Sequence, residues 1–455
     1  MLKIINPADD SLVREVESDD GESIVAKYSA ARAAQPAWAA LALAERLGAL
    51  RRFKASVEKR KDELARTLTL ETGKPIAQSR NELNALAGRL DYFLEKTKAA
   101  IAPEAVLNDP KMKEEITHEP LGVVANVSAW NYPYFVGSNV FVPALLAGNA
   151  VLYKPSEFAS LTGLAIGEML RAAGVPPDVF CVVIGAGATG GFLVDQPVDG
   201  VFFTGSYATG ARIAAACAPR MVKLQLELGG KDPSYVCEDA DAKTAAESLA
   251  DGAMYNAGQS CCSVERIYVH ERIHARFVEA FVATVQGFKC GDPMDEATYL
   301  GPLARAPQLA VLERQVADAV AKGAMLLTGG KRISRPGNWF EATVLSNVNH
   351  AMALMREESF GPIIGIQKVA DDAEAVRLMN DTEYGLTAGV YTPDEARARR
   401  ILAQIRSGSV YWNCCDRVSP RLPWSGVGHS GVGVTLSTYG IRAFTRPKAW
   451  HLRAV

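Results

Sequence analysis

The stretch DGVFFTGSYATG, residues 199–210, combines a short strand, a turn and the start of a helix. Its apolar run ends at Thr204, Gly205 and Ser206, and a helix is expected to open at Tyr207. A helix that opens there directs its unpaired backbone N–H groups, and the Ser206 hydroxyl beside them, toward whatever lies in front of it. The pattern therefore predicts either a phosphate-binding helix end or an ordinary N-cap formed by Ser206.

The same strand-then-helix order recurs from residue 122 onward. The apolar runs are GVVANV, AVLYKPS, VFCVVIG, DGVFFTGS and MVKLQLELGG, and helical segments separate the first four from their successors. A second alternating block covers about 232–430, with helices expected near 241–257, 273–288, 306–322, 371–380 and 393–406. Residues of about 22–100 have helical spacing, and those of about 101–125 indicate extended chain. We therefore predict an α/β protein with parallel sheets, whose ligands bind at the C-terminal ends of strands.

Length, charge and cysteine content narrow the class of protein. A chain of 455 residues exceeds the roughly 250–300 that one hydrophobic core serves, so two or three structural units are expected. Lys+Arg 49 and Asp+Glu 51 give a net charge of −2, which favours a small-molecule partner over nucleic acid. No apolar run reaches the ~20 residues of a membrane helix, and the N-terminal sequence has no signal or transit character. We therefore expect a cytoplasmic protein without a membrane partner, and eight cysteines without C-x-x-C predict free thiols.

Two short motifs each allow two interpretations. GAGATG, with Gly185, Gly187 and Gly190, fits the dinucleotide fingerprint, but no acidic residue ends a following strand about 20 residues on, so a glycine-rich turn is the alternative. HERIH, residues 270–274, fits a zinc-protease pattern. Because His270 ends the expected strand RIYVH, the two rings would not share one helix face. We therefore expect a strand end and a helix start there, and no metal site.

Charged side chains stand at the ends of two apolar strands. Glu227 ends the strand of QLELGGKDP, and burial there would raise its pKa toward the range of a general base, whereas a solvent-facing edge strand is the alternative. Lys154 ends the strand of LYKPSE, with Glu157 three residues on. This pair predicts either hydrogen bonds to sugar hydroxyls or a surface ion pair.

The stretch YNAGQSCCSVER, residues 255–266, places Cys261 and Cys262 side by side in a loop between a helix and a strand. Loops of this kind often hold reactive groups, but a buried structural cysteine is the commonest state of the residue. The pattern alone leaves the nucleophile and the core residue equally favoured.

These pieces together resemble the NAD(P)-dependent aldehyde dehydrogenase superfamily. The resemblance rests on INPA, GVVANVSAWNYP, AGNAVLYKPSE, GVFFTGS, LELGGKDP, NAGQSC, LGPL, REESFGPI, YGLTAGVYT and PWSGVGHSGVG, in that order along nearly the whole chain. It implies an aldehyde-dehydrogenase-like α/β fold. A Rossmann-type NAD(P)-binding domain is expected from 1–101 and 121–229, and a catalytic domain from 230–430. An oligomerisation arm with the C-terminal strand is expected from 102–120 and 431–455.

The resemblance also implies roles for individual residues. Cys261 is implied as the nucleophile, Glu227 as the water-activating base, and Asn131, with the backbone N–H of Cys261, as the oxyanion donor. The implied reaction oxidises an aldehyde to a carboxylate through a thiohemiacetal and a thioester at the cysteine. The residues implied to contact the cofactor are Trp130, Lys154, Glu157, Gly205, Ser206, Leu228, Glu358 and Phe360. NAD is the expected cofactor because Glu157 would repel a 2′-phosphate, and NADP is possible.

The substrate is less well defined by the resemblance, since PWSG stands where the family commonly has PFGG and His429 where a lysine is frequent. The residues expected in the pocket are Tyr132, Phe135, Tyr255, Trp424, Arg417 and Arg421. Four aromatic walls predict an apolar aliphatic or aromatic aldehyde. The two arginines predict instead a semialdehyde, of the succinate-semialdehyde type, whose far carboxylate they would hold.

Two other functions are alternatives to aldehyde oxidation, and the resemblance also implies an oligomer. A coenzyme A-acylating relative is disfavoured because Glu227 provides for hydrolysis, and a catalytically silent binding protein is disfavoured by the intact catalytic set. Self-association as a homodimer or homotetramer is expected.

Overall fold

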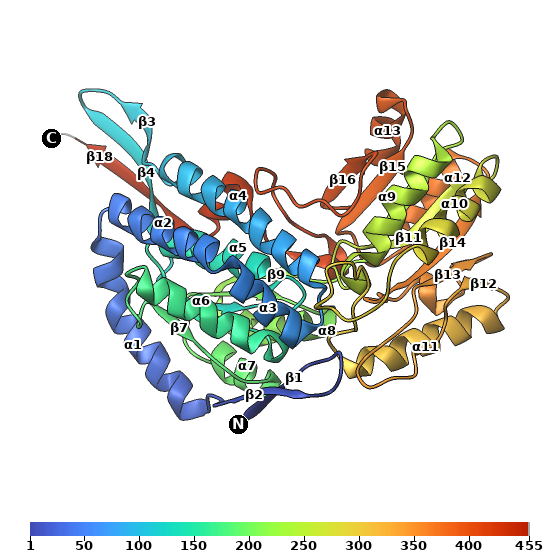
Figure 1. Ribbon diagram of the computed structural model, residues 1–455. Coiled ribbons are helices and arrows are strands. Elements are labelled where there is room, and N and C mark those ends of the chain that lie inside the picture. The colour runs from blue at the N-terminus through green and yellow to red at the C-terminus, as the bar shows by residue number, and fades with distance from the viewer. Residues whose placement is uncertain (454–455) are drawn as a thin grey trace.

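A computed structural model describes residues 1–453 of the chain, and it consists of two α/β bodies with a projecting β arm (Figure 1). The first body contains the N-terminal helices and a six-stranded sheet. The second contains a seven-stranded sheet. The predicted α/β class is confirmed by this architecture.

The six-stranded sheet is parallel except for one short edge strand. Its strands, in order across the sheet, are β17 (Gly431–Val432), β9 (Lys223–Glu227), β8 (Gly200–Thr204), β5 (Val123–Val127), β6 (Ala150–Lys154) and β7 (Phe180–Val182). The helices of this body are α1 (Gly21–Ala40), α2 (Leu43–Lys59), α3 (Lys61–Thr72), α4 (Ile76–Ala100), α5 (Pro133–Leu146), α6 (Ser160–Ala172), α7 (Gly187–Val194), α8 (Tyr207–Cys217) and α14 (Ser437–Arg442).

Alternation of side chains along the strands gives this sheet two separate cores. Val123 and Ala125 point to the face covered by α1, α7 and α8, whereas Val124 points to the face covered by α2 to α6. Both faces of each central strand are therefore buried, which explains why these strands are mostly apolar in sequence.

The seven-stranded sheet is parallel except at one edge, where β12 runs antiparallel. Its strands, in order, are β12 (Met325–Thr328), β13 (Thr343–Ser346), β14 (Ile363–Val369), β11 (Val264–His270), β10 (Asp232–Val236), β15 (Thr387–Tyr391) and β16 (Ser409–Trp412). Its helices are α9 (Ala242–Met254), α10 (His274–Gln286), α11 (Ala306–Ala321), α12 (Asp372–Asn380) and α13 (Glu395–Leu402). The five helices expected in this block from the sequence are confirmed within a few residues at each end.

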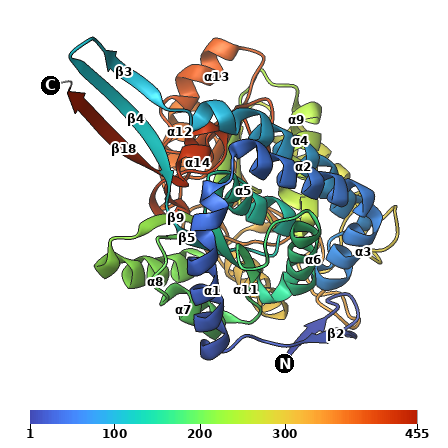
Figure 2. The same ribbon diagram turned by 90° about the vertical axis from the view of Figure 1, so that its left-hand side faces the viewer.

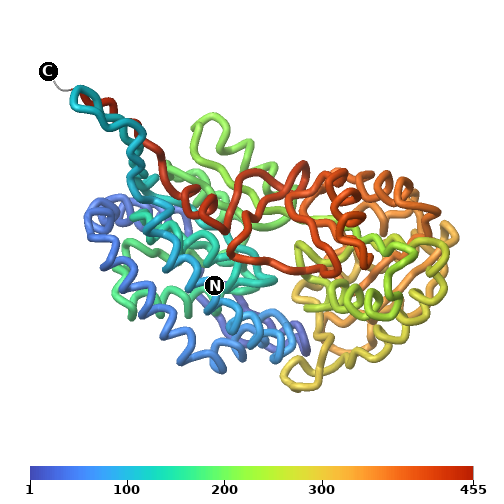
Figure 3. Tube along the Cα trace, turned by 90° about the horizontal axis from the view of Figure 1, so that it is seen from above, coloured from blue at the N-terminus to red at the C-terminus, as the bar shows by residue number. Residues whose placement is uncertain are grey.

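The arm is a three-stranded antiparallel sheet made of β3 (Glu104–Asn108), β4 (Met112–Pro120) and β18 (Thr445–Arg453). It extends away from both bodies in each of three views (Figures 1, 2 and 3). In its described residues, the segment 431–455, expected to belong to the arm, is divided between the first body and the arm. β17 pairs with β9 in the six-stranded sheet, and β18 pairs with β4 in the arm. A separate antiparallel pair, β1 (Leu2–Ile5) and β2 (Leu12–Val16), lies at the N-terminus.

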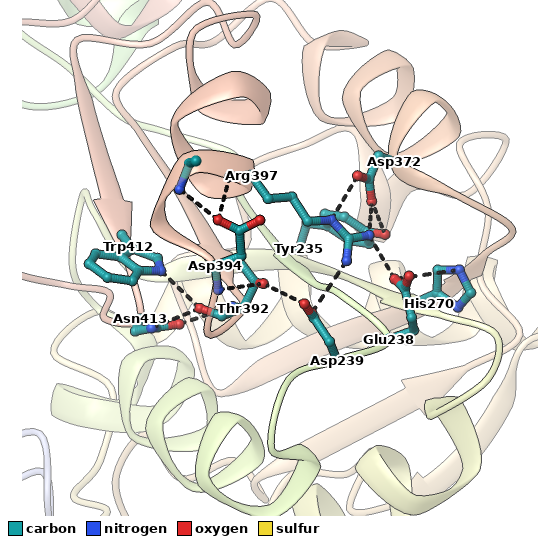
Figure 4. A network of polar contacts seen from close by, with 11 residues as sticks. Tyr235, Glu238, Asp239, His270, Asp372, Thr392, Asp394, Arg397, Trp412 and Asn413 are labelled. Atoms are coloured by element: carbon teal, nitrogen blue, oxygen red, sulfur yellow. Dashed lines mark hydrogen bonds and ion pairs between the residues drawn. The ribbon is translucent and has the colours of Figure 1, made fainter.

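The HERIH motif lies at a junction in the second body. His270 is the last residue of β11, and His274 is the first of α10. The His270 ring lies 3.7 Å from a carboxylate oxygen of Glu238, in a polar network centred on Arg397 (Figure 4). The predicted strand end and helix start are therefore confirmed.

Arg397 ties α13 to the ends of β10 and to α12. Its guanidinium contacts Asp372 at 2.6 Å, Glu238 at 2.7 Å and Asp239 at 3.4 Å (Figure 4). Tyr235 donates its hydroxyl proton to Asp372 at 2.8 Å. This network stands at the outer end of the second sheet and contributes no residue to the cavity described below.

None of the helices in residues 1–453 combines the length and the apolar character that a membrane crossing requires.

Candidate active site

A cavity of about 560 Å³ lies between the two bodies, at the ends of the parallel strands. Helix α4 forms one wall, α5 a second, and loops of the second body close it. The six residues expected in the pocket all line it, together with Cys261, Cys262 and Glu227; these six are Tyr132, Phe135, Tyr255, Trp424, Arg417 and Arg421. Arg417 and Arg421 are exposed, and Trp424 is buried. The rings of Tyr132 and Phe135 stack at 6.0 Å.

Cys261 follows a loop with an unusual backbone. Asn256, Ala257 and Gly258 all have φ between 53° and 70°, in the left-handed region that only glycine adopts without strain. A Cβ on Gly258 would lie 2.3 Å from the carbonyl oxygen of Gly361, so no larger residue fits there. This loop turns the chain sharply after α9 and presents a partly exposed Cys261 to the cavity.

Cys262 differs from Cys261 in burial and in bonding. Its side chain is buried, and its thiol donates to Asp416 Oδ1 at 3.0 Å. Contact with Cys261, burial and the nearby Asp416 carboxylate together raise the pKa of the Cys262 thiol. Of the two adjacent thiols, Cys261 is thus the more accessible, and Cys262 is held by a partner.

Asn131 lies behind the cysteine loop rather than in the cavity wall. It is buried, and its amide donates to the carbonyl oxygen of Gln259, two residues before Cys261, at 3.2 Å. Asn256 donates in turn to the carbonyl oxygen of Asn131 at 3.3 Å. The amide predicted as oxyanion donor is therefore anchored to the loop that carries the predicted nucleophile.

Glu227 ends β9 in the interior of the sheet, because β8 pairs with one side of β9 and β17 with the other. The solvent-facing alternative is thereby wrong. Its side chain is 7% exposed and accepts a hydrogen bond from the Thr435 hydroxyl. Burial raises the pKa of Glu227 to about 7, although Thr435 and the positive charge of Arg89 act in the opposite direction.

The two glycines after Glu227 bring three parts of the site together. A Cβ on Gly229 would lie 2.3 Å from the carboxylate oxygens of Glu358, and one on Gly230 would lie 2.7 Å from the carbonyl oxygen of Cys261. Because the Cys261 carbonyl belongs to the backbone, no larger residue fits at Gly230, whereas a side chain at position 229 would displace the Glu358 carboxylate. The close backbone approach predicted for LELGG is therefore confirmed.

The N-terminus of α8 fits the phosphates of a dinucleotide. Ser206 is the N-cap, but its hydroxyl donates to the Thr209 hydroxyl at 3.1 Å and accepts no backbone N–H of the first turn. The first N–H groups of α8 consequently remain available to an anion in front of the helix. Gly205 is fixed beside the predicted catalytic base, since its N–H donates to the carbonyl oxygen of Glu227 at 3.0 Å.

Lys154 fits the hydroxyls of a ribose. Its ammonium group is buried, donates to the carbonyl oxygen of Pro155 at 3.1 Å and makes no ion pair within residues 1–453. Burial lowers the pKa of Lys154. Glu157 lies close by and accepts from the Ser156 hydroxyl at 3.1 Å. A buried amine with unused donors fits a hydroxylated ligand better than the surface ion pair that was the alternative.

The remaining residues predicted to contact the cofactor lie around the same edge. The rings of Trp130 and Phe360 meet edge to face at 5.6 Å. Glu358 accepts from the N–H of Gly230 at 3.0 Å, and burial raises its pKa to about 8. Leu228 is buried, and its side chain fills the space next to Gly210 of α8.

Two buried charged pairs that the sequence analysis did not identify support the site. Lys231 donates to Glu265 at 2.6 Å, and Glu265 also accepts the N–H groups of Ser359 and Phe360, which fixes the loop that carries Glu358. Glu265 stands in the apolar strand sequence SVERIYVH, and a charged residue in a buried strand is the signal from which this ion pair could have been predicted.

The second unidentified pair is on α4. Lys74, just before α4, donates to Glu82 within it, and the Lys74 ammonium lies 3.8 Å from the centre of the Tyr132 ring. Arg89, seven residues after Glu82 and on the same face of α4, also lines the cavity. At helical spacing these side chains look like an ordinary solvated face, so the sequence offered no signal.

Comparison with known proteins gives the same family. The model of the aldehyde dehydrogenase family matches residues 1–450. The chain is 35% identical over 452 residues to aminoaldehyde dehydrogenase 2, peroxisomal, of Pisum sativum, covering 97% of this chain and 90% of that protein. An E. coli NADP-dependent enzyme shares 33% identity with a TM-score of 0.97, covering 100% of this chain and 95% of that chain. PnpE, solved in complex with nicotinamide adenine dinucleotide, shares 34% identity with a TM-score of 0.96, covering 99% and 94%. The chain therefore belongs to the aldehyde dehydrogenase family and is an NAD(P)-dependent oxidoreductase of aldehydes.

Proposed function

We propose that the chain oxidises an aldehyde to a carboxylate by covalent catalysis at Cys261, with hydrolysis by water that Glu227 activates. The observation that carries the proposal is one cavity lined by an accessible cysteine and by a buried glutamate whose pKa is raised to about 7. A base with that pKa is half ionised near neutral pH, where it both accepts and returns a proton efficiently.

The first step is attack of the Cys261 thiolate on the aldehyde carbonyl carbon, which forms a thiohemiacetal and places negative charge on oxygen. The Asn131 amide, which the Gln259 carbonyl now holds beside the loop, and the N–H of Cys261 are the donors for that oxygen. Donors of this kind each lower the barrier by about 3–4 kcal/mol in comparable sites.

The later steps are oxidation of the thiohemiacetal and hydrolysis of the thioester, and the hydrolysis needs one base. The α8 N-terminus, Lys154 and the loop of Glu358 would hold NAD(P)⁺, which would supply the hydride acceptor for oxidation of the adduct at Cys261. Glu227 then takes a proton from water, the hydroxide adds to the thioester carbon, and the carboxylate leaves as Cys261 is released. Burial of Glu227 between β8 and β17 keeps bulk water from competing with this single proton transfer.

Hydrolysis is favoured over acyl transfer to coenzyme A by the same glutamate. Water must lose a proton to a base as it attacks the thioester, and a buried base that ionises near pH 7 can accept that proton. A thiol such as that of coenzyme A ionises more easily and depends less on such a base. Cys261 and Glu227 in one cavity wall, with Asn131 bonded to the loop that carries Cys261, support an active enzyme over a silent relative.

The deciding experiment is pre-steady-state formation of NADH or NADPH with an aldehyde panel. Wild-type protein is expected to turn over continuously. Glu227→Gln is expected to give at most one equivalent per subunit and then stop, because the thioester is not hydrolysed. Cys261→Ser is expected to give none. Steady turnover by Glu227→Gln at the wild-type rate would exclude the proposed base, and no reduced cofactor with any aldehyde would exclude the function.

We also propose NAD as the preferred cofactor, on the basis of Glu157. Its carboxylate lies next to Lys154 at the edge predicted for the adenosine ribose and would repel a 2′-phosphate. Replacement by Gln is expected to raise kcat/KM for NADP relative to NAD by about tenfold, since one removed repulsion at close range amounts to about 1.4 kcal/mol. A wild-type preference for NADP would contradict this choice.

A further inference from the structure

Arg89 is an unusual residue of the cavity wall. It lies on α4, is only 4% exposed, and lines the same cavity as Cys261. Its guanidinium donates one hydrogen bond, to Asn139 Oδ1 at 2.5 Å, and stands 4.3 Å from the centre of the Phe135 ring. An arginine has five N–H groups, so most of its donors have no acceptor among residues 1–453.

Two other buried arginines of the chain have more partners. Arg266 donates to the carbonyl oxygens of Lys231, Leu378 and Met379 and to the Tyr268 hydroxyl. Arg46 likewise donates to four carbonyl oxygens. These two arginines, which lie outside the cavity, thus each have four acceptors, as expected for buried polar groups in general. Arg89 has one.

No carboxylate forms an ion pair or a hydrogen bond with Arg89 within the described part of the chain. Of the acids in the cavity wall, Glu82 is engaged by Lys74 and by the N–H of Tyr134. Asp416 accepts from Cys262, and Asp251 accepts from the Tyr299 hydroxyl.

The fourth acid, Glu227, accepts from Thr435. Burial raises the pKa of Glu227 and of Asp416, so both hold protons more readily than usual. Burial lowers the pKa of Arg89 to about 10, which still leaves it charged at neutral pH. The charges of Glu227 and Glu82 favour the charged guanidinium, but neither carboxylate hydrogen-bonds to it.

We propose that this enzyme acts on aldehydes that carry a second, terminal carboxylate, and that Arg89 binds this carboxylate inside the cavity. The proposal rests on the function proposed above and names its substrate class. A guanidinium presents two parallel N–H groups that match one carboxylate, and a single negative charge balances it. The stacked Tyr132 and Phe135 rings then face the carbon chain between the two ends of the substrate.

The exposed arginines at the mouth fit the same substrate. Arg417 and Arg421 line the entrance without an ion pair in residues 1–453, so they attract anions from solution. The pea relative is named for aminoaldehydes, which carry a positive charge that Arg89 would repel. A carboxylate tail agrees with the semialdehyde alternative expected from the sequence, in which Arg417 and Arg421 hold the carboxylate, and differs from the apolar aldehyde expected first.

The test is a comparison of kcat/KM within matched pairs of aldehydes, namely 4-oxobutanoate with butanal and 4-carboxybenzaldehyde with benzaldehyde. Wild-type enzyme is expected to prefer the carboxylate member by roughly 10–100-fold, the range of a charge-assisted hydrogen bond. Arg89→Gln is expected to reduce this ratio at least tenfold, and Arg89→Lys to retain part of it. Arg80→Gln, on the same helix but outside the cavity, is the matched control and should keep the wild-type ratio.

Three results would overturn the proposal: a wild-type ratio near one, preference for an aminoaldehyde, or an unchanged ratio in Arg89→Gln. If Arg89→Gln does not fold, inhibition of the wild type decides instead. Succinate is then expected to compete with the aldehyde more strongly than butanoate, and equal inhibition would contradict the proposal. All of these results differ from failure of the proposed function, because in that case no aldehyde of any charge would yield reduced cofactor.

Discussion

Glu227 and Arg89 share one cavity, and the charge of each favours the ionised form of the other. Burial shifts the pKa of Glu227 upward, and the positive charge of Arg89 opposes that shift. The balance leaves a carboxyl group whose protonation changes at about pH 7. The working pH of the base proposed above therefore depends on residues of β9 and α4 together.

This balance predicts the pH dependence of turnover. Where hydrolysis of the thioester limits the rate, kcat should rise with pH through about 7, because Glu227 acts only after it has lost its proton. In Arg89→Gln the removed positive charge no longer favours the carboxylate, so the rise should move to higher pH. Stopped-flow and steady-state pH profiles of both proteins check this, and a profile that moves to lower pH would contradict the assigned sign.

The two adjacent cysteines should differ sharply on substitution. Cys261→Ser should lower kcat at least 1000-fold, since a serine hydroxyl is not ionised at neutral pH. Cys262→Ser keeps a small donor toward Asp416 and should cost less than tenfold. Labelling of the free thiol with iodoacetamide, read by mass spectrometry, provides the independent measurement. Faster labelling of Cys262 than of Cys261 would reverse the assignment.

At the scale of single elements, helix α6 depends on a carboxylate from a different helix. Glu71, near the end of α3, accepts the N–H groups of Leu161 and Thr162 at 2.8 Å each, in the first turn of α6. It thereby does the work of an N-cap across a tertiary contact.

Loss of this contact should destabilise the protein measurably. Glu71→Ala should lower the free energy of unfolding by about 1–3 kcal/mol, because two buried N–H groups lose their acceptor. Glu63→Ala, on the same helix but exposed and paired only with Arg60, should lower it by less than about 1 kcal/mol. Denaturant unfolding followed by circular dichroism makes the comparison, and equal losses would show that Glu71 has no capping role.

Helices and strands with a strong hydrophobic pattern could be predicted from the sequence. Features that depend on contact with a distant part of the chain could not. Strands such as β6 and β8 are apolar up to their last residue because both of their faces are covered, and this appears in the sequence as an apolar run. Polar residues at the ends of buried strands, including Glu227 at the end of β9, could be located for the same reason.

The cavity-facing side of α4 could not be predicted in this way. Arg89 stands in LAGRLDYFLEK, where an arginine at helical spacing is typical of a solvated surface. Its burial arises from α5, which packs on α4 from a distant part of the chain. Similarly, the short β17 has only two residues and becomes a strand because β9 lies beside it.

At the scale of the whole molecule, the arm is the part that the two bodies leave uncovered. β18 is an edge strand of nine residues, and Trp450 and Leu452 on it are 39% and 48% exposed. A long exposed edge strand presents unpaired backbone N–H and C=O groups, which readily pair with a strand of another chain. We propose that it pairs with a second copy of this protein in a homodimer or homotetramer.

Association through the arm predicts that Leu452→Glu weakens the oligomer, since a charge would be placed in the buried contact. Light scattering after size exclusion should show a smaller mass for the variant than for the wild type at equal concentration. Lys54→Glu, on α2 and outside the arm strands, serves as the control. A wild-type protein that is monomeric at micromolar concentration would exclude the proposal.

The residues of α4 that line the cavity recur along one face of that helix. They are Gln78, Asn81, Glu82, Ala85, Gly88 and Arg89, whereas Cys261, Glu227 and Asn131 come from other segments. Gly229, Gly230 and Gly258 leave the catalytic segments almost no room for change. Natural variation and laboratory evolution can therefore act on one helical face, altering which aldehyde enters while the bond-making machinery is inherited intact.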